Sequence, residues 1–200
     1  MNPYQVTTDF EASLCDYTGA PYAVAVNSCT AALHLTCKLW LEDQTDNKVC
    51  IPKNTYCSVP MSIIHAGGTP VFQDKDWRGA YQLEPLPIFD CARRFTSGMY
   101  VSGQYQCVSF SAAKILGIEQ GGAILHDNVA ADKWFRRMRF DGRQEGVHPL
   151  DENFTLVGHH CIMLPSTAGQ ALLRLHHLPD NNEDMQDYPY PDLSQHSAFK

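Results

Sequence analysis

One lysine stands between two segments that read as buried strands. Lys114 lies between the apolar segments 106–111 and 121–126, in a chain that has only 15 Lys and Arg residues. A buried lysine can form a Schiff base with an aldehyde once its amine is partly neutral. Ser109 precedes it by five residues and supplies a hydroxyl. The pattern predicts a covalent role for Lys114, with Ser109 nearby.

Three further groups follow other predicted strands. The segment NSCTAA (27–32) opens a predicted helix, whose free N–H groups and positive dipole end bind an anion such as phosphate, with the Thr30 hydroxyl beside them. Asp90 ends a predicted strand, where its carboxylate could hold a pyridinium nitrogen and make the ring an electron sink. Tyr56 offers an aromatic ring for stacking. The cofactor that needs all of these groups is pyridoxal 5′-phosphate.

Each of these residues also has an ordinary structural interpretation. Lys114 could be a surface lysine in a loop, and Asp90 could be a turn residue or a helix cap at the end of its strand. Tyr56 could belong to the core, and Thr30 sits at a helix cap whether or not it binds phosphate. The functional interpretation rests on position, because all of these features fall where strands end, the usual site region of an α/β sheet.

Strands and helices alternate along the chain and place these residues at strand ends. Continuous apolar runs predict six strands, at 22–26, 48–52, 69–74, 85–90, 106–111 and 121–126. Apolar spacing and capping residues predict helices at 9–16, 27–41, 55–67, 130–142 and 164–178. Apolar strands that alternate with helices are typical of an α/β fold with a mostly parallel sheet. We expect a three-layer α/β/α domain over 1–179 and an irregular surface tail over 180–200.

Composition and charge restrict the class of protein. The 15 basic and 22 acidic residues give a net charge of −7. The densest basic cluster is Arg136, Arg137 and Arg139, and Arg137 and Arg139 are predicted to form a solvated helix face. A general nucleic-acid surface is therefore not expected. The apolar runs are too short for a membrane span and the N-terminus lacks a secretion signal, so we expect a cytoplasmic protein. None of the eight cysteines forms a C-x-x-C pair, which gives a metal site no support and favours free thiols.

The motifs together resemble the DegT/DnrJ/EryC1/StrS group of sugar aminotransferases, which has the aspartate-aminotransferase fold type I. The family segment S-G-T-A-A-L-H-L is similar to NSCTAALHL here, and P-x-x-T-aromatic is similar to PKNTYCS. The family segment D-A-A-Q resembles FDCAR, S-F-x-x-x-K is matched by the run from Ser109 to Lys114, and L-R-N-H-G resembles MRFDG. The five segments occur in the family order between about residues 8 and 178.

This resemblance implies a role for each candidate residue. Lys114 would be the Schiff-base lysine and Asp90 the partner of the pyridine nitrogen. Tyr56 would stack on the ring, while Ser109 and Thr30 would bind the phosphate.

Four positions depart from the family pattern. Cys29 replaces the glycine before the phosphate-binding threonine, and Arg93 replaces a glutamine that donates to the phenolic oxygen of the ring. Arg93 can also donate, but it adds a charge. His160 aligns with an asparagine that reaches the phosphate of the partner subunit, and Ile162 aligns with an arginine that it cannot replace. Cys29, Arg93 and His160 are nevertheless predicted as cofactor-binding residues.

The resemblance implies a pyridoxal-phosphate-dependent aminotransferase. It would transfer an amino group from a donor such as glutamate to a keto-sugar nucleotide, in a homodimer with shared sites. Family members carry a further C-terminal domain, and this chain ends near the point where that domain would begin. The alternative is a non-catalytic or reduced homologue that acts as a binding or partner subunit. A nucleotide-binding α/β domain is a third interpretation, disfavoured because the chain lacks G-x-G-x-x-G and G-x-x-x-x-G-K-S/T.

Overall fold

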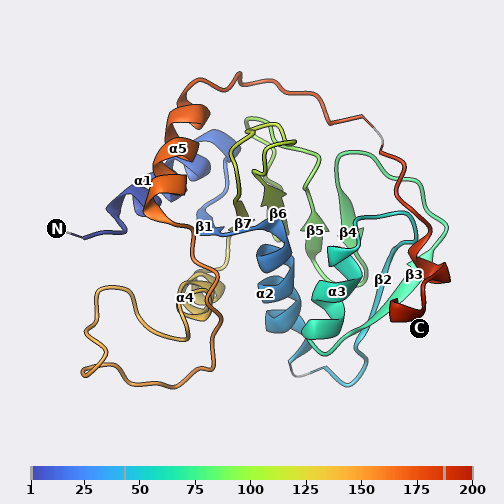
Figure 1. Ribbon diagram of the computed structural model, residues 1–200, viewed down its shortest axis with the longest axis horizontal. Coiled ribbons are helices and arrows are strands. Elements are labelled where there is room, and N and C mark those ends of the chain that lie inside the picture. The colour runs from blue at the N-terminus through green and yellow to red at the C-terminus, as the bar shows by residue number, and fades with distance from the viewer. Residues whose placement is uncertain (1, 43, 187, 200) are drawn as a thin grey trace.

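A mixed β-sheet runs through the middle of the molecule (Figure 1). The computed structural model describes residues 2–42, 44–186 and 188–199. The main sheet has the strand order β1-β7-β6-β5-β4, with bounds β1 Tyr22–Val26, β7 Gly122–His126, β6 Tyr105–Ser109, β5 Ile88–Asp90 and β4 Tyr81–Leu83. A second sheet pairs β2 (Lys48–Pro52) with β3 (Thr69–Gln73). Backbone hydrogen bonds between Cys50 and Glu84 connect β2 to the end of β4.

The predicted α/β architecture is confirmed, but the prediction of a mostly parallel sheet is wrong. In the main sheet, β1 with β7, β7 with β6 and β5 with β4 are antiparallel, and only β5 with β6 is parallel. The pair β2 and β3 is also parallel. A continuous apolar run indicates that both faces of a strand are buried, but it does not indicate whether the strand pairs in a parallel or an antiparallel way. The connection from β6 to β7 contains no helix, and the chain simply turns back beside the strand it has left.

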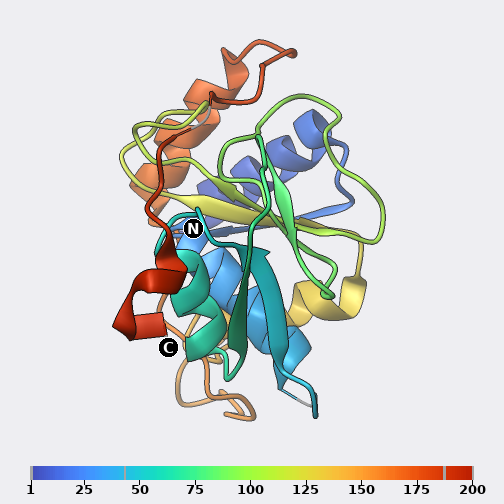
Figure 2. The same cartoon turned by 90° about the vertical axis from the view of Figure 1, so that its right-hand side faces the viewer.

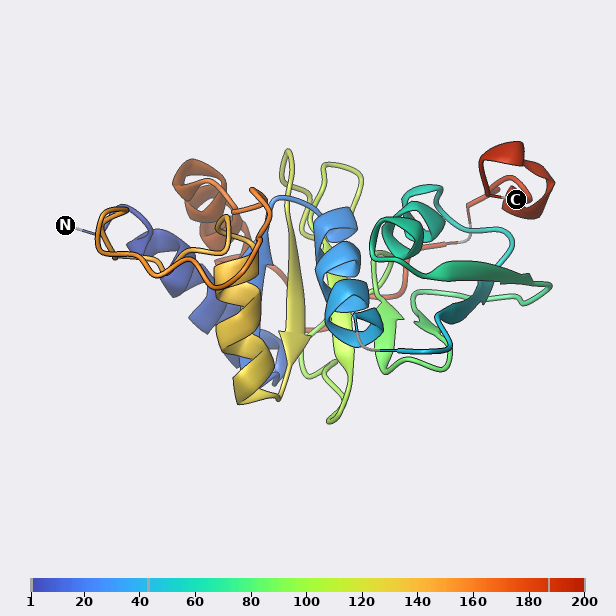
Figure 3. The ribbon, with the colours of Figure 1, turned by 90° about the horizontal axis from the view of Figure 1, so that it is seen from below.

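Helices cover both faces of the sheet, which gives the three layers expected from the sequence. Figure 2 shows α1 (Gln5–Thr18) and α5 (Pro165–His176) on one side, and α2 (Cys29–Leu41), α3 (Ser58–His65) and α4 (Val129–Met138) on the other. Seen from below in Figure 3, α4, α2 and α3 follow one another along the sheet. Each side has its own core of buried apolar residues, with Phe10 and Leu14 in one and Leu33 and Phe135 in the other. The strand β4 and the early end of α4 at Met138 were not predicted.

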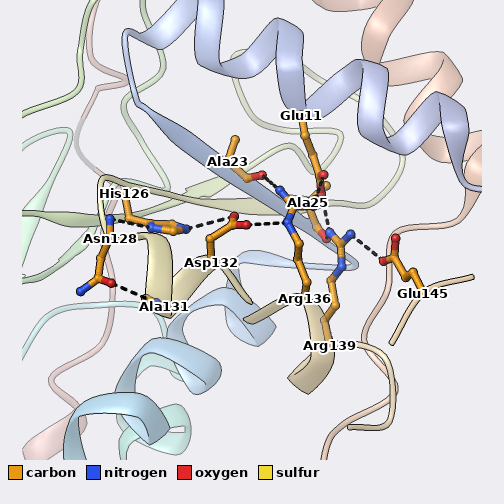
Figure 4. Close-up of polar contacts among 10 residues, drawn as sticks. All are labelled: Glu11, Ala23, Ala25, His126, Asn128, Ala131, Asp132, Arg136, Arg139 and Glu145. Carbon is orange, nitrogen blue, oxygen red and sulfur yellow. Dashed lines mark hydrogen bonds and ion pairs between the residues drawn. The ribbon is translucent and has the colours of Figure 1, made fainter. Parts of the chain in front are cut away.

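A buried network of charges joins α1, β1 and α4 (Figure 4). The Glu11 carboxylate accepts hydrogen bonds from the backbone N–H of Ala25, at 2.8 Å, and from Arg136, at 2.6 Å, and also from Arg139. Glu145 forms a second ion pair with Arg139, at 2.8 Å. The Arg139 side chain is 2% exposed, so the prediction that it belongs to a solvated helix face is wrong. Helix α4 ends at Met138, one residue before Arg139, and the Arg139 side chain points toward Glu11.

The last part of the chain returns across the molecule from α5 to the side of β2 and β3 (Figure 1). We call residues 180–186 and 188–193 the C-terminal strap. Apart from two short 3-10 turns, Leu193–Gln195 and Ser197–Phe199, the described residues after α5 form no regular helix or strand. Backbone hydrogen bonds nevertheless fix this segment, from Ser97 N–H to the Asp180 carbonyl and from Leu193 N–H to the Lys53 carbonyl, both at 2.9 Å. The strap thus lies docked along the face that carries the candidate site.

Candidate functional site

A cavity of about 680 Å³ opens where β5 and β6 end and where α2 begins. Seven of the eight residues predicted to bind the cofactor line it: Cys29, Thr30, Tyr56, Asp90, Arg93, Ser109 and Lys114. The cavity is lined by more apolar than polar surface, as is usual for a small-molecule site with a few convergent polar groups. The fold therefore gathers residues that lie as far apart in the sequence as 29 and 114.

The N-terminus of α2 forms one side of the cavity. Ser28 is its N-cap, and the Ser28 hydroxyl accepts a hydrogen bond from the backbone N–H of Ala31 at 3.1 Å. Among the described residues, no acceptor takes the backbone N–H groups of Cys29 or Thr30, so these donors remain available for an anion. The Thr30 hydroxyl donates to the Ser58 hydroxyl at 2.9 Å, at the start of α3. This arrangement fits a phosphate group.

Cys29 contributes its backbone and not its thiol. Its Sγ atom points into the core and donates to the carbonyl of Cys107 at 3.5 Å, and burial raises the pKa of the thiol well above its ordinary value. The thiol is therefore neutral and unreactive at physiological pH. Because the backbone N–H remains free, replacing the family's glycine by cysteine leaves the anion-binding donor in place.

Strand β7 passes directly behind the first turn of α2. A Cβ atom on Gly122 would lie 2.5 Å from the backbone nitrogen of Cys29 and 2.6 Å from the carbonyl carbon of Ser28. Only a residue without a side chain allows this close approach. Gly122 pairs with Ser109 across β6 and β7, so the glycine also sets the distance between the helix N-terminus and the Ser109 hydroxyl.

Asp90 is a buried carboxylate at the end of β5. It accepts hydrogen bonds from the backbone N–H of Ala92, at 2.9 Å, and from the Tyr81 hydroxyl, at 3.1 Å. Burial raises the pKa of Asp90, and these hydrogen bonds and the charge of Lys114 only partly oppose that effect. In the described part of the chain, no cationic group lies within ion-pair distance of this carboxylate. A protonated ring nitrogen would provide the missing positive charge.

Tyr81 is a residue of this site that the sequence did not indicate. It lies on β4, which was not predicted, and it is 5% exposed. Its hydroxyl also pairs with the Thr55 hydroxyl at 2.6 Å, next to Tyr56. The only trace in the sequence is the alternation of Tyr81 and Leu83, which is typical of a short half-buried strand. Tyr81 thus orients the Asp90 carboxylate from the neighbouring strand of the sheet.

Lys114 lies in the turn that connects β6 with β7. Its backbone N–H donates to the Ser111 carbonyl at 2.8 Å, and its side chain is half-buried. Burial lowers the pKa of Lys114, the positive charge of Arg93 lowers it further, and the charge of Asp90 acts in the opposite direction. A lowered pKa increases the fraction of neutral amine at physiological pH, which is the form that attacks an aldehyde. The surroundings therefore favour the chemistry predicted for this lysine.

The C-terminal strap closes the cavity on the side facing Arg93. Met185, Tyr188, Tyr190 and Pro191 all line it. The Arg93 guanidinium donates to the Gln186 carbonyl, and the backbone N–H of Met185 donates to the Arg93 carbonyl at 2.9 Å. Sequence reasoning missed these strap residues, because a polar segment rich in Asp and Pro carries no periodic signal.

His160 lies outside this cavity. Its Nδ1 atom is 2.9 Å from a carboxylate oxygen of Asp141, and its side chain is exposed. It lines a neighbouring cavity of about 230 Å³, together with Asn27 and Gln120, and Gln120 borders both cavities. Contact between His160 and the phosphate of a partner subunit therefore remains a prediction.

Within residues 2–42, 44–186 and 188–199, no three His, Cys, Asp or Glu side chains are grouped as metal ligands. No helix of this described part is long and apolar enough to cross a membrane. All eight cysteines are free thiols.

Comparison with protein families supports the resemblance found in the motifs. Residues 1–99 match the model of the DegT/DnrJ/EryC1/StrS aminotransferase family. Over 79 residues, the chain is 46% identical to the spore coat polysaccharide biosynthesis protein SpsC of Bacillus subtilis, and over 82 residues it is 36% identical to the GDP-perosamine synthase of Caulobacter vibrioides. These segments are 40% and 39% of this chain but only 20% and 22% of the two relatives. The chain thus matches about a fifth of the length of these curated relatives.

Solved structures show the same fold. The sugar aminotransferase CalS13 of Micromonospora echinospora superposes with a TM-score of 0.73 at 18% identity, over 86% of this chain and 60% of CalS13. PseC of Helicobacter pylori, an aminotransferase involved in the biosynthesis of pseudoaminic acid, gives a TM-score of 0.69 at 17% identity, over 86% of this chain and 57% of PseC. The chain therefore has the fold of pyridoxal-phosphate enzymes of fold type I.

Proposed function

We propose that this chain binds pyridoxal 5′-phosphate and acts as a sugar aminotransferase, because residues 1–99 match the family model and the chain has the same fold as CalS13. One observation carries the proposal. Lys114, a half-buried amine of lowered pKa, and Asp90, a buried carboxylate with no ion-pair partner among the described residues, open onto one cavity with the N-terminus of α2. These three features match the aldehyde, the ring nitrogen and the phosphate of that cofactor.

Each residue has a role that its surroundings support. When bound, the cofactor supplies an aldehyde and a ring that delocalises negative charge from a substrate carbon. The Nζ atom of Lys114 would hold the cofactor at its aldehyde carbon, with the aldehyde oxygen leaving as water, and when free it would carry a proton as general base and then general acid. The carboxylate of Asp90 holds the proton on the ring nitrogen, and Tyr81 and Ala92 fix that carboxylate in place. The backbone N–H groups of Cys29 and Thr30 bind the phosphate.

The proposed substrates follow the named relatives. GDP-perosamine synthase and PseC support a sugar nucleotide as amino acceptor, and an amino acid such as glutamate is the proposed donor. We further propose a cytoplasmic homodimer in which His160 faces the site of the second subunit. The exposed His160 side chain and its position beside the cavity containing Gln120 are compatible with that role.

A non-catalytic homologue is the second candidate, and one observation favours it. Arg93 replaces a neutral glutamine of the family, and its guanidinium is already engaged by the Gln186 carbonyl of the strap. The strap that holds Arg93 also lines the cavity, and its side chains would oppose entry of a substrate. A chain of this kind would bind the cofactor without turning over glutamate.

The experiment that tests the proposal is a cofactor titration of the purified protein. We expect a visible Schiff-base absorption band that borohydride reduces, and we expect Lys114→Ala to abolish it. Lys133→Ala, which changes an exposed lysine on α4, is the matched control and should keep the band. Addition of glutamate should then remove the band and release a 2-oxo acid. Absence of a band at saturating cofactor refutes the proposal, and a band that glutamate leaves unchanged supports the non-catalytic homologue.

A further inference from the structure

At Asp184 and Met185, the C-terminal strap is held beside the cavity by an ion pair and by a backbone hydrogen bond. The Arg94 guanidinium makes two hydrogen bonds to the Asp184 carboxylate, at 2.8 and 2.6 Å. The next residue, Met185, donates its backbone N–H to the Arg93 carbonyl at 2.9 Å. Paired hydrogen bonds of this kind between arginine and carboxylate define an orientation as well as an attraction. These contacts therefore fix the position of the strap where it begins to line the cavity.

The strap is held a second time at Tyr190 and Leu193. The side-chain amide of Asn54 donates to the Tyr190 carbonyl at 3.0 Å, and Leu193 donates its backbone N–H to the Lys53 carbonyl at 2.9 Å. The Leu193 side chain is 3% exposed, so an apolar anchor follows the part that lines the cavity. A chain end held at two separate points is not a frayed terminus.

Between these anchors, the strap places Tyr190 in an aromatic cluster beside the cavity. The Tyr190 ring lies 6.3 Å from the Tyr56 ring in an edge-on arrangement and 6.0 Å from Trp77 in a stacked one, and Tyr188 lies 4.9 Å away. Burial raises the pKa of the Tyr190 hydroxyl, which stays neutral at physiological pH. Aromatic faces of this kind bind planar rings, and they bind cationic ones most strongly.

The strap also divides two cavities. Arg93, Tyr188 and Tyr190 line both the candidate cofactor cavity and a neighbouring cavity of about 440 Å³. Two of these three shared residues, Tyr188 and Tyr190, belong to the strap. The strap is therefore part of the wall that defines the site, although it lies more than 60 positions beyond Lys114 in the chain.

We infer that the C-terminal strap is a built-in wall of the cofactor site and that Tyr190 is a further binding residue, contacting a planar pyridine-type ring together with Tyr56. This inference rests on the proposed function, because it takes pyridoxal phosphate as the occupant. It assigns a second ring contact, in addition to that of Tyr56, to a segment outside the recognised motifs. The aromatic ring of Tyr190, and not its hydroxyl, is the group that acts.

Equilibrium dialysis with pyridoxal phosphate measures this contribution directly. Tyr190→Ala should raise the Kd by about 3- to 10-fold, which corresponds to one lost aromatic contact, while Tyr190→Phe should keep the wild-type value. Asp184→Asn, which loosens the strap without changing a cavity-lining residue, should raise the Kd by up to about 5-fold. Phe199→Ala is the matched control, because that ring packs on Phe72 at 6.1 Å and not on the cavity.

The outcomes separate the inference from the proposed function. If the wild type binds the cofactor and Tyr190→Ala binds it equally well, the inference is wrong and the proposed function stands. A loss in Tyr190→Phe equal to that in Tyr190→Ala also overturns it, because the hydroxyl would then be the acting group. If the wild type binds no cofactor, both fail. Thermal unfolding of each variant identifies a misfolded protein, and Asp184→Asn then tests the strap independently of Tyr190.

Discussion

Replacement of Glu11 by glutamine tests whether the buried charge network holds α1, β1 and α4 together. The Glu11 side chain is 4% exposed and is paired with Arg136 and with Arg139, whose side chain is 2% exposed. Burial acts to raise the pKa of Glu11, but the two arginine charges outweigh it and lower the pKa. Glutamine keeps the size of the side chain and removes its charge, so two guanidinium groups lose their shared partner.

The magnitude follows from the burial of the pair. Breaking a buried ion pair by removing one partner costs about 3 to 5 kcal/mol, and we expect the lower end of this range because Arg139 keeps Glu145 and Arg136 keeps Asp132 as partners. In a chain of 200 residues this corresponds to a fall in Tm of roughly 10 °C. Glu42→Gln is the matched control, since Glu42 is 56% exposed and lies 3.7 Å from Lys38 on the same helix. An exposed pair of this type contributes less than about 0.5 kcal/mol.

Urea unfolding followed by circular dichroism gives both free energies of unfolding. The difference between wild type and Glu11→Gln should also shrink as the pH falls below the ordinary carboxyl pKa of 4.5. The reason is that a lowered pKa contributes stability above the unfolded-state pKa, and this contribution is lost as the native carboxylate is protonated. A loss below about 1 kcal/mol at neutral pH, or a difference that does not depend on pH, would refute the reasoning.

Two other perturbations have predictable results. Burial lowers the pKa of His126 from 6.5 to about 4, so the unfolded state binds the proton more readily and stability should fall by about 3 kcal/mol as the pH decreases from 6.5 to 4. Acid titration of the unfolding free energy checks this, and His126→Phe should flatten that part of the profile, whereas an unchanged profile would contradict it. Gly122→Ala should cost about 1 to 3 kcal/mol and weaken cofactor binding, because its Cβ would meet the backbone of Cys29 at 2.5 Å. Gly169→Ala is the control, because the nearest atom to its Cβ would be on Val6, at 3.7 Å. Alanine favours a helix more than glycine does, so the free energy of unfolding of this variant should stay the same or rise. Equal losses of stability in both variants would show that crowding at α2 is not the cause.

Much of the candidate site could be predicted from the sequence, because its residues lie at the ends of local elements. Ser28 caps α2 as expected, and Asp90 is the last residue of β5. A capping hydroxyl or a strand end is recognisable from a few neighbouring residues. The structure then brings Thr30, Asp90 and Lys114 to one cavity, since strand ends and helix starts of the layered fold meet at the same edge.

Contacts between distant segments could not be predicted in this way. Tyr81 reaches Asp90 from a strand of three residues, which is too short to give a clear periodic pattern. Arg139 has a basic side chain, and the usual place of such a residue is the surface unless a partner is buried with it. That partner, Glu11, lies 128 positions earlier in the chain. No local pattern in the sequence indicates that Glu11 and Arg139 form a pair.

The sequence by itself determined the order of the five helices and of the strands other than β4, the family resemblance and seven residues of the cavity. Each of these depends on short-range patterns of apolar, capping and turn residues. The tertiary structure alone decided the direction of the strands, the burial of Arg139 and the position of the C-terminal strap. Strand direction depends on how connections pack, and a polar segment such as the strap is ordered only by anchors elsewhere, here Arg94 and Lys53. These are long-range interactions, whose free energy appears only when the whole fold has assembled.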